Sequence, residues 1–93
     1  MTKVDMYLLH FCTPYKHAKH YLGIAYSGIE RRIEEHRQGR GANITKVLKA
    51  NNIEFVVAKT WLQVSRKSEN KVKGRGLTEY CPICNPKPRE PRL

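Results

Sequence analysis

The chain has 93 residues, enough for one small domain with a modest core, and its 40% apolar residues exclude an intrinsically disordered protein. It carries 18 Lys and Arg against 8 Asp and Glu, a formal charge of +10, and so strong a positive field favours polyanionic partners, nucleic acid above all. The sequence contains neither a run of about 18 apolar residues nor a signal-peptide pattern, so we expect an intracellular, cytoplasmic protein with no membrane partner.

Two apolar segments near the N-terminus predict an antiparallel β-hairpin. In Met6 to Cys12 large side chains alternate on both faces, which indicates a strand covered at least in part on each side. His20 to Ala25 is a second short strand, joined to the first by a loop that contains Pro14. Cys12 is expected to be a small core residue of the first strand.

A helix of about three turns is predicted to follow the hairpin. Ser27 and Glu30 have the S-x-x-E spacing of a capping box, so the helix should begin at about Gly28. Gly39 and Gly41 supply its end, because glycine readily adopts the left-handed conformation found there.

Two polar residues of this helix lie unusually close to its apolar face. At about 100° per residue, His36 shares a face with Ile29 and Ile33, Arg32 lies at the edge of that face, and Arg31 points away. Taken alone, Arg32 could simply cover the core edge with its aliphatic stem, and His36 could be a hydrogen-bonded core histidine.

The remaining sequence predicts a second helix, a third strand and a third helix. Asn43 or Thr45 can cap the short second helix. Ile53 to Leu62 is rich in branched and aromatic residues and should be the best-buried strand. Ser65 can cap a third helix that runs to about Lys73. The predicted fold is therefore α/β, a three-stranded antiparallel sheet flanked by three helices.

The third predicted helix is almost wholly polar. It has a single carboxylate, Glu69, among the cations Arg66, Lys67, Lys71 and Lys73. A charge run is usually a solvated face, but an isolated acid among cations is unusual enough to make Glu69 a candidate functional residue.

Cys81 and Cys84 form a C-x-x-C motif, which is half of the usual ligand set of a zinc site. One interpretation is a zinc ion shared with a partner chain or completed by His10, His17 or His20. The other is a tight turn that ends the domain.

The order of these elements resembles the GIY-YIG nuclease family, in particular its small stand-alone single-domain members. The resemblance covers roughly residues 6–73, and its motifs are Asp5-Met6-Tyr7 for Gly-Ile-Tyr, Tyr21-Leu22-Gly23 for Tyr-Ile-Gly, Arg32 before Glu35 and His36, and Glu69. The first motif keeps only its tyrosine. A loop one residue longer than the family's leaves a choice between Arg31 and Arg32, which helical phase decides for Arg32. The chain thus divides into a nuclease-like domain, 1–80, and a C-x-x-C turn with a flexible basic tail, 81–93.

This resemblance implies a metal-dependent endonuclease that hydrolyses phosphodiester bonds in DNA. Glu69 would hold Mg²⁺ or Mn²⁺, and Arg32 would bind the scissile phosphate. Tyr7 or Tyr21 would deprotonate or position the attacking water, and His36 would orient a tyrosine or relay a proton.

Further residues follow from the same resemblance. Gly23 would let the phosphate approach the backbone, although it could equally mark a bulge. The DNA backbone would be held by the basic side chains of Arg40, Lys46, Lys71 and Lys73. We expect a monomer or weak dimer. The alternative function is a non-catalytic DNA- or RNA-binding module on the same fold, and a weaker one is a basic zinc-knuckle protein built around the C-x-x-C motif.

Overall fold

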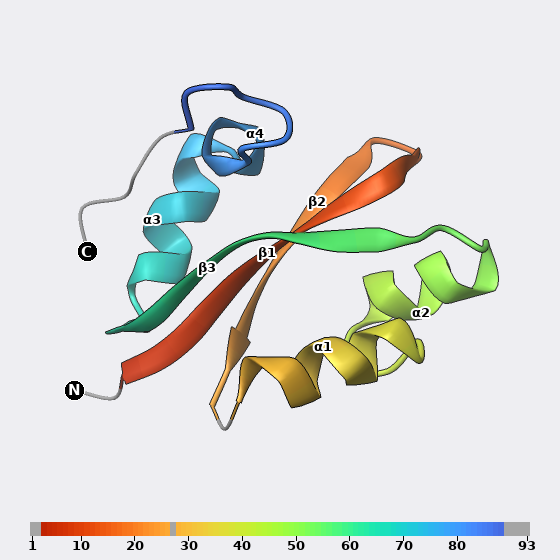
Figure 1. Cartoon of the computed structure of the whole chain (residues 1–93), viewed down its shortest axis with the longest axis horizontal. Helices are drawn as coiled ribbons and strands as arrows, with labels where there is room; N and C mark the ends of the chain where they lie inside the picture. The colour runs from red at the N-terminus through yellow and green to blue at the C-terminus, as the bar shows by residue number, and fades with distance from the viewer. Residues whose placement is uncertain (1–2, 27, 89–93) are drawn as a thin grey trace.

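The computed structural model describes residues 3–26 and 28–88. Its elements in chain order are β1 (Lys3–Tyr15), β2 (Ala18–Ala25), α1 (Ile29–Arg37), α2 (Asn43–Ala50), β3 (Phe55–Ser65), α3 (Ser68–Arg75) and α4 (Leu77–Tyr80). The three-stranded antiparallel sheet and the mixed α/β class are confirmed (Figure 1). The described residues add a short fourth helix, α4, where three helices were predicted. Each helix in this part of the chain is too short or too polar to cross a membrane.

The sheet has the order β2-β1-β3, so β1 is the central strand and β3 lies at an edge. The expectation that Ile53 to Leu62 forms the best-buried strand is therefore wrong, since Val56, Val57 and Leu62 on β3 are exposed. Burial belongs instead to β1, which has a hydrogen-bonded neighbour on both sides. Beyond Phe11 this strand runs out of the core, so Cys12 is exposed rather than buried.

Alternate residues of β1 point into two separate cores, as the period of two of a strand requires. One face carries Val4, Met6 and Leu8, which join Trp61 of β3, Val72 of α3 and Tyr80 of α4. The other face carries Tyr7, Leu9 and Phe11, which join Ile33 of α1 and Leu48 of α2. The helices α1 and α2 therefore cover one face of the sheet, and α3 and α4 cover the other (Figure 1).

The first helix, α1, begins and ends at glycines. Its N-cap is Gly28, in a positive-φ conformation (φ 105°), and Gly39 and Gly41 with φ of 80° and 92° follow its end. The predicted capping box cannot be compared, because Ser27 lies outside the described residues.

The other two predicted caps differ from the structure. The N-cap of α2 is Ala42, with no side-chain cap bond, so neither Asn43 nor Thr45 caps it. Thr45 instead donates its hydroxyl to the Ala42 carbonyl, at 2.9 Å. α3 begins at Ser68, two positions later than a cap at Ser65 would place it, because the Ser65 hydroxyl accepts the Lys67 N–H in a turn before the helix.

Candidate functional site

Tyr7 lies at the centre of the sheet and is fully buried. Its neighbour across the β1–β2 pairing is Gly23. A Cβ at Gly23 would overlap with Cζ and Oη of the Tyr7 ring, so this position must be glycine for the ring to lie across β2. The glycine of the second motif thus makes room for the tyrosine of the first, and its approach to a phosphate stays a prediction.

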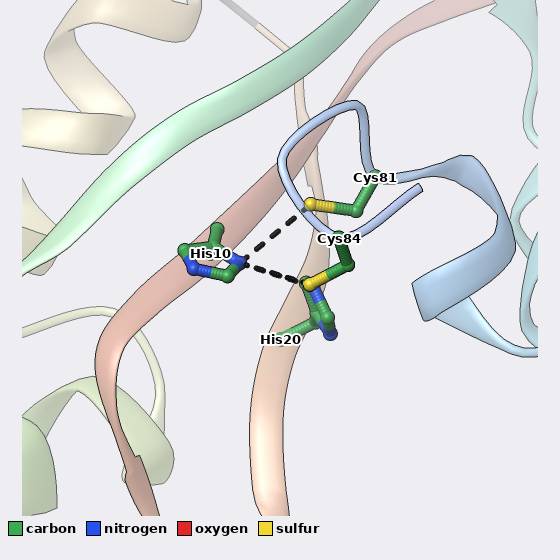
Figure 2. A group of neighbouring side chains, drawn as sticks. All are labelled: His10, His20, Cys81 and Cys84. Atoms are coloured by element: carbon green, nitrogen blue, oxygen red, sulfur yellow. Dashed lines mark hydrogen bonds between the residues drawn. The ribbon is translucent and has the colours of Figure 1, made fainter. Parts of the chain in front are cut away.

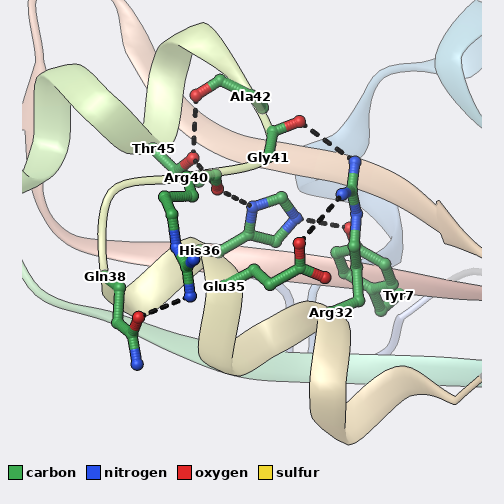
Figure 3. Close-up of polar contacts among 9 residues, drawn as sticks. All are labelled: Tyr7, Arg32, Glu35, His36, Gln38, Arg40, Gly41, Ala42 and Thr45. Atoms are coloured by element: carbon green, nitrogen blue, oxygen red, sulfur yellow. Dashed lines mark hydrogen bonds and ion pairs between the residues drawn. The ribbon is translucent and has the colours of Figure 1, made fainter.

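The Tyr7 hydroxyl reaches helix α1, where it hydrogen-bonds His36 (Figure 3). The distance from Tyr7 Oη to His36 Nε2 is 2.5 Å, and His36 Nδ1 lies 3.0 Å from the Arg40 carbonyl oxygen. A carbonyl oxygen only accepts, so Nδ1 carries a hydrogen. In the neutral ring Nε2 is then the acceptor, and Tyr7 donates to it. The two contacts fix the imidazole as a base aimed at the Tyr7 hydroxyl.

Burial keeps these groups neutral at pH 7. Burial lowers the pKa of His36, against the opposing effect of its hydrogen bond to the Arg40 backbone. Burial also raises the pKa of Tyr7 to about 12, although a hydrogen bond from Arg32 opposes the rise. The pKa of Tyr21 is raised by burial, lowered by Arg32 and raised again by the charge of Glu69. A free phenolate is therefore unfavourable at either tyrosine.

Arg32 lies beside this pair with its side chain about one-third exposed (32%). Its Nη2 donates to the Gly41 carbonyl at 3.0 Å, and its Nη1 lies 4.0 Å from a carboxylate oxygen of Glu35 (Figure 3). Its Nε is buried and has no hydrogen-bond partner among the described residues. Arg32 therefore keeps a donor for an acceptor that the protein does not supply.

Gly41 is a site residue that sequence reasoning took only for a helix end. Its φ of +92° favours glycine, and a Cβ there would lie 3.0 Å from both Arg32 Nη1 and His36 Cε1. The sequence did contain a hint of this role in Gly39-Arg40-Gly41. One glycine is enough to end a helix, so the second indicates a further function. The Arg40 carbonyl between them, which orients His36, could not be found from side-chain types.

A surface pocket of about 290 Å³ opens beside Arg32. It is lined by Ala25, Tyr26, Gly28, Arg31, Arg32 and Glu35. Arg31 is exposed and lies on the wall of this pocket, so both arginines of the pair border the same hollow, while only Arg32 reaches Tyr7.

Glu69, in the first turn of α3, is the remaining member of the predicted catalytic set. It forms an ion pair with Lys73 at 3.6 Å, and its side chain is 27% exposed. Besides burial, the charge of its carboxylate raises the pKa of Tyr21. In the described part of the chain it joins no group of three or more His, Cys, Asp or Glu side chains.

The predicted DNA-contacting cations are all exposed: Arg40, Lys46, Lys71 and Lys73. The Arg40 guanidinium donates to the Gln38 side chain at 2.6 Å, and Lys73 pairs with Glu69. Their exposed positions leave them accessible to a polyanion.

A second cluster lies on the opposite face of β1 from Tyr7. It consists of His10 on β1, His20 on β2, and Cys81 and Cys84 after α4 (Figure 2). Their donor atoms all lie within 4.8 Å of one another, so the group could hold a metal ion. Nitrogen and sulfur donors suit zinc rather than magnesium. His17, the third histidine considered above, is exposed and outside the group.

The first cysteine of the C-x-x-C motif is also part of the folded core. Cys81 is fully buried in the same cluster as Trp61 and Tyr80. The division of the chain at residue 80 thus runs through packed structure. The His10–His20 pairing was within reach of the sequence, because any register that opposes Tyr7 and Gly23 also opposes these two histidines.

Comparison with known proteins does not assign this chain to a family. No protein-family model matches the chain, and no curated protein or solved structure matches it. Its function has to be inferred from the chemistry of the site.

Proposed function

We propose that the protein is a metal-dependent endonuclease that hydrolyses phosphodiester bonds in DNA, a small single-domain nuclease of the GIY-YIG type. The observation that carries the proposal is the buried 2.5 Å hydrogen bond from Tyr7 to His36, 29 positions away, with Arg32 beside it. A base, a hydroxyl and a partly unsatisfied guanidinium in one place are the groups that phosphodiester hydrolysis requires.

The Tyr7–His36 pair can activate water by a proton relay. Tyr7 is fully buried in the free protein, so the relay requires a water that reaches its oxygen in the DNA complex. That water would transfer its proton to the Tyr7 oxygen while Tyr7 passes its own proton to His36 Nε2. No free phenolate forms, which matters because burial raises the pKa of Tyr7 to about 12. The resulting hydroxide forms the new P–O bond, the bond to the leaving sugar oxygen breaks, and that oxygen takes a proton from solvent. The His36 imidazolium keeps its Nδ1–H bond to the Arg40 carbonyl.

Arg32 would bind the scissile phosphate. Its side chain is about one-third exposed and lines the adjoining pocket, and a phosphate oxygen is a strong acceptor for a guanidinium. As negative charge grows on the phosphoryl oxygens, fixed donors of this kind typically account for about 10²–10³ in rate. Loss of Arg32 should therefore affect cleavage much more than binding.

Glu69 fits the expected divalent ion in donor type, because Mg²⁺ and Mn²⁺ prefer carboxylate oxygens and keep several waters. The partial exposure of its side chain leaves space for those waters. The ion would polarise the phosphoryl oxygen, and Lys73 would have to yield part of its ion pair with Glu69.

Nicking of supercoiled plasmid with Mg²⁺ or Mn²⁺ tests the proposal. Wild type should cut, while Arg32→Ala and Glu69→Gln should lose most of the activity. The matched control is Arg31→Ala, which removes the same charge from the same pocket and should keep most of it. A wild type that binds DNA without cutting would point to the non-catalytic binding module instead. Equal cutting by all four proteins would refute the assigned roles.

A further inference from the structure

We infer that His10, His20, Cys81 and Cys84 bind one structural zinc ion. The four residues come from three separate places: the central strand β1, the edge strand β2 and the turn after α4. All four donor atoms lie within 4.8 Å of one another (Figure 2). Two nitrogens and two sulfurs make a Cys₂His₂ set, a common closed ligand set of tetrahedral zinc.

Four of the six separations between donors match a tetrahedral zinc ion, and the other two are no longer than 4.8 Å. With Zn–N of about 2.0–2.1 Å and Zn–S of about 2.3 Å, tetrahedral geometry places two nitrogens about 3.3 Å apart and a nitrogen and a sulfur about 3.6 Å apart. The distance from His10 Nδ1 to His20 Nε2 is 3.3 Å. From His10 Nδ1 to the sulfurs of Cys81 and Cys84 the distances are 3.6 and 3.5 Å, and from His20 Nε2 to the Cys84 sulfur 3.4 Å.

Hydrogen bonding alone does not account for this arrangement. His10 Nδ1 is within bonding distance of three partners, His20 Nε2 and both cysteine sulfurs. A ring nitrogen offers a single in-plane hydrogen or lone pair, so it can satisfy one partner well and not three. A shared cation at the centre gives each donor its own bond instead.

The site would be structural rather than catalytic, because four protein ligands leave no open position for water or substrate. It would tie the C-terminal turn to the hairpin where the regular β1–β2 pairing stops, since the register is irregular between His10 and Tyr15. The cluster lies on the α3–α4 face, away from the Tyr7 and His36 pair. This inference is therefore independent of the nuclease proposal.

Metal analysis of the full-length protein, purified without chelator, tests the site directly. We expect about one zinc per chain, as a single tetrahedral site requires. Cys84→Ser should lose this zinc, and its cysteine is the exposed one of the pair, so the substitution leaves the core intact. Cys12→Ser and His17→Asn are matched controls at exposed positions outside the cluster and should keep it.

Thiol alkylation provides a second measurement that needs no variant. Cys12 should react with iodoacetamide at once, whereas Cys81 and Cys84 should react only after a chelator removes the metal. The same chelator should lower the melting temperature, and added Zn²⁺ should restore it. Protein that holds no zinc after purification and binds none on titration would overturn the inference. So would a Cys81–Cys84 disulfide in that protein, or zinc lost equally from the control variants.

Discussion

Substitution of Gly23 by alanine should separate the packing of the site from its chemistry. The new Cβ would overlap with Cζ, Oη and Cε2 of Tyr7. The Tyr7 ring is 0% exposed, so no solvent-filled space is open to it. Gly23 is not in the positive-φ region, so alanine causes no backbone strain there, and the effect reports the ring contact alone.

The expected cost has two parts. Overpacking of a close-packed core costs about 1–3 kcal/mol. If the ring turns away, the 2.5 Å bond between Tyr7 and His36 breaks, and a buried group left unsatisfied costs a further 1–3 kcal/mol or so. Alanine also lowers the conformational entropy of the unfolded chain, which stabilises the folded protein by only about 0.4–1 kcal/mol. We therefore expect Gly23→Ala to lower the free energy of unfolding by about 1–5 kcal/mol.

Urea unfolding followed by circular dichroism measures this change. Gly74→Ala is the control: it lies in α3, a Cβ there meets nothing within 4 Å, and it should be neutral or stabilising by up to about 1 kcal/mol. In a Tyr7→Leu background the cost of Gly23→Ala should largely disappear, because the two changes share one contact. The packing argument is wrong if Gly23→Ala has the same free energy of unfolding as wild type. It is also wrong if the substitution lowers that free energy equally in the Tyr7→Leu background.

Three further predictions concern the same site and the DNA-binding surface. Tyr7→Phe leaves His36 Nε2 without its donor and should cost about 1–3 kcal/mol in urea unfolding, together with most plasmid nicking. Burial lowers the pKa of His36 from 6.5 in the folded state, so the unfolded chain binds more protons below that pH. The free energy of unfolding should therefore fall as pH drops below 6.5, and less so in His36→Gln; an unchanged slope would show that His36 is not the titrating group. If Arg40 and Lys46 each contact one phosphate, each alanine variant should reduce the steepness with which the logarithm of the DNA association constant falls with the logarithm of salt concentration, by about 0.9. An unchanged slope would show that the residue does not contact DNA.

Local patterns in the sequence were enough for the fold class. Both faces of β1 carry large side chains, and the structure places them in two cores, as that alternation predicts. Helix α1 was predicted from its capping-box spacing, from the glycines that follow its end and from its apolar face. The errors fall at strand burial and helix caps: β3 was expected to be the best-buried strand because its composition is apolar, yet composition does not state how many neighbours a strand has.

The candidate catalytic residues were also suggested by the sequence, since Arg32 and His36 stand out on their helix and the family resemblance adds Tyr7. What brings them within bonding distance is tertiary: the register that opposes Tyr7 with Gly23, and the approach of Gly41 and the Arg40 carbonyl to helix α1. Such backbone groups have no sequence signature of their own.

The His10, His20, Cys81 and Cys84 cluster shows the same limit most clearly. The sequence determined the ligand types, whereas the approach of the two histidines follows from the same register that opposes Tyr7 with Gly23. Only the folded chain decides that Cys81, 71 positions beyond His10, returns to that face of the sheet. Periodicity acts over one or two turns of helix or a few residues of strand, whereas contacts between distant segments depend on the packing of the whole core.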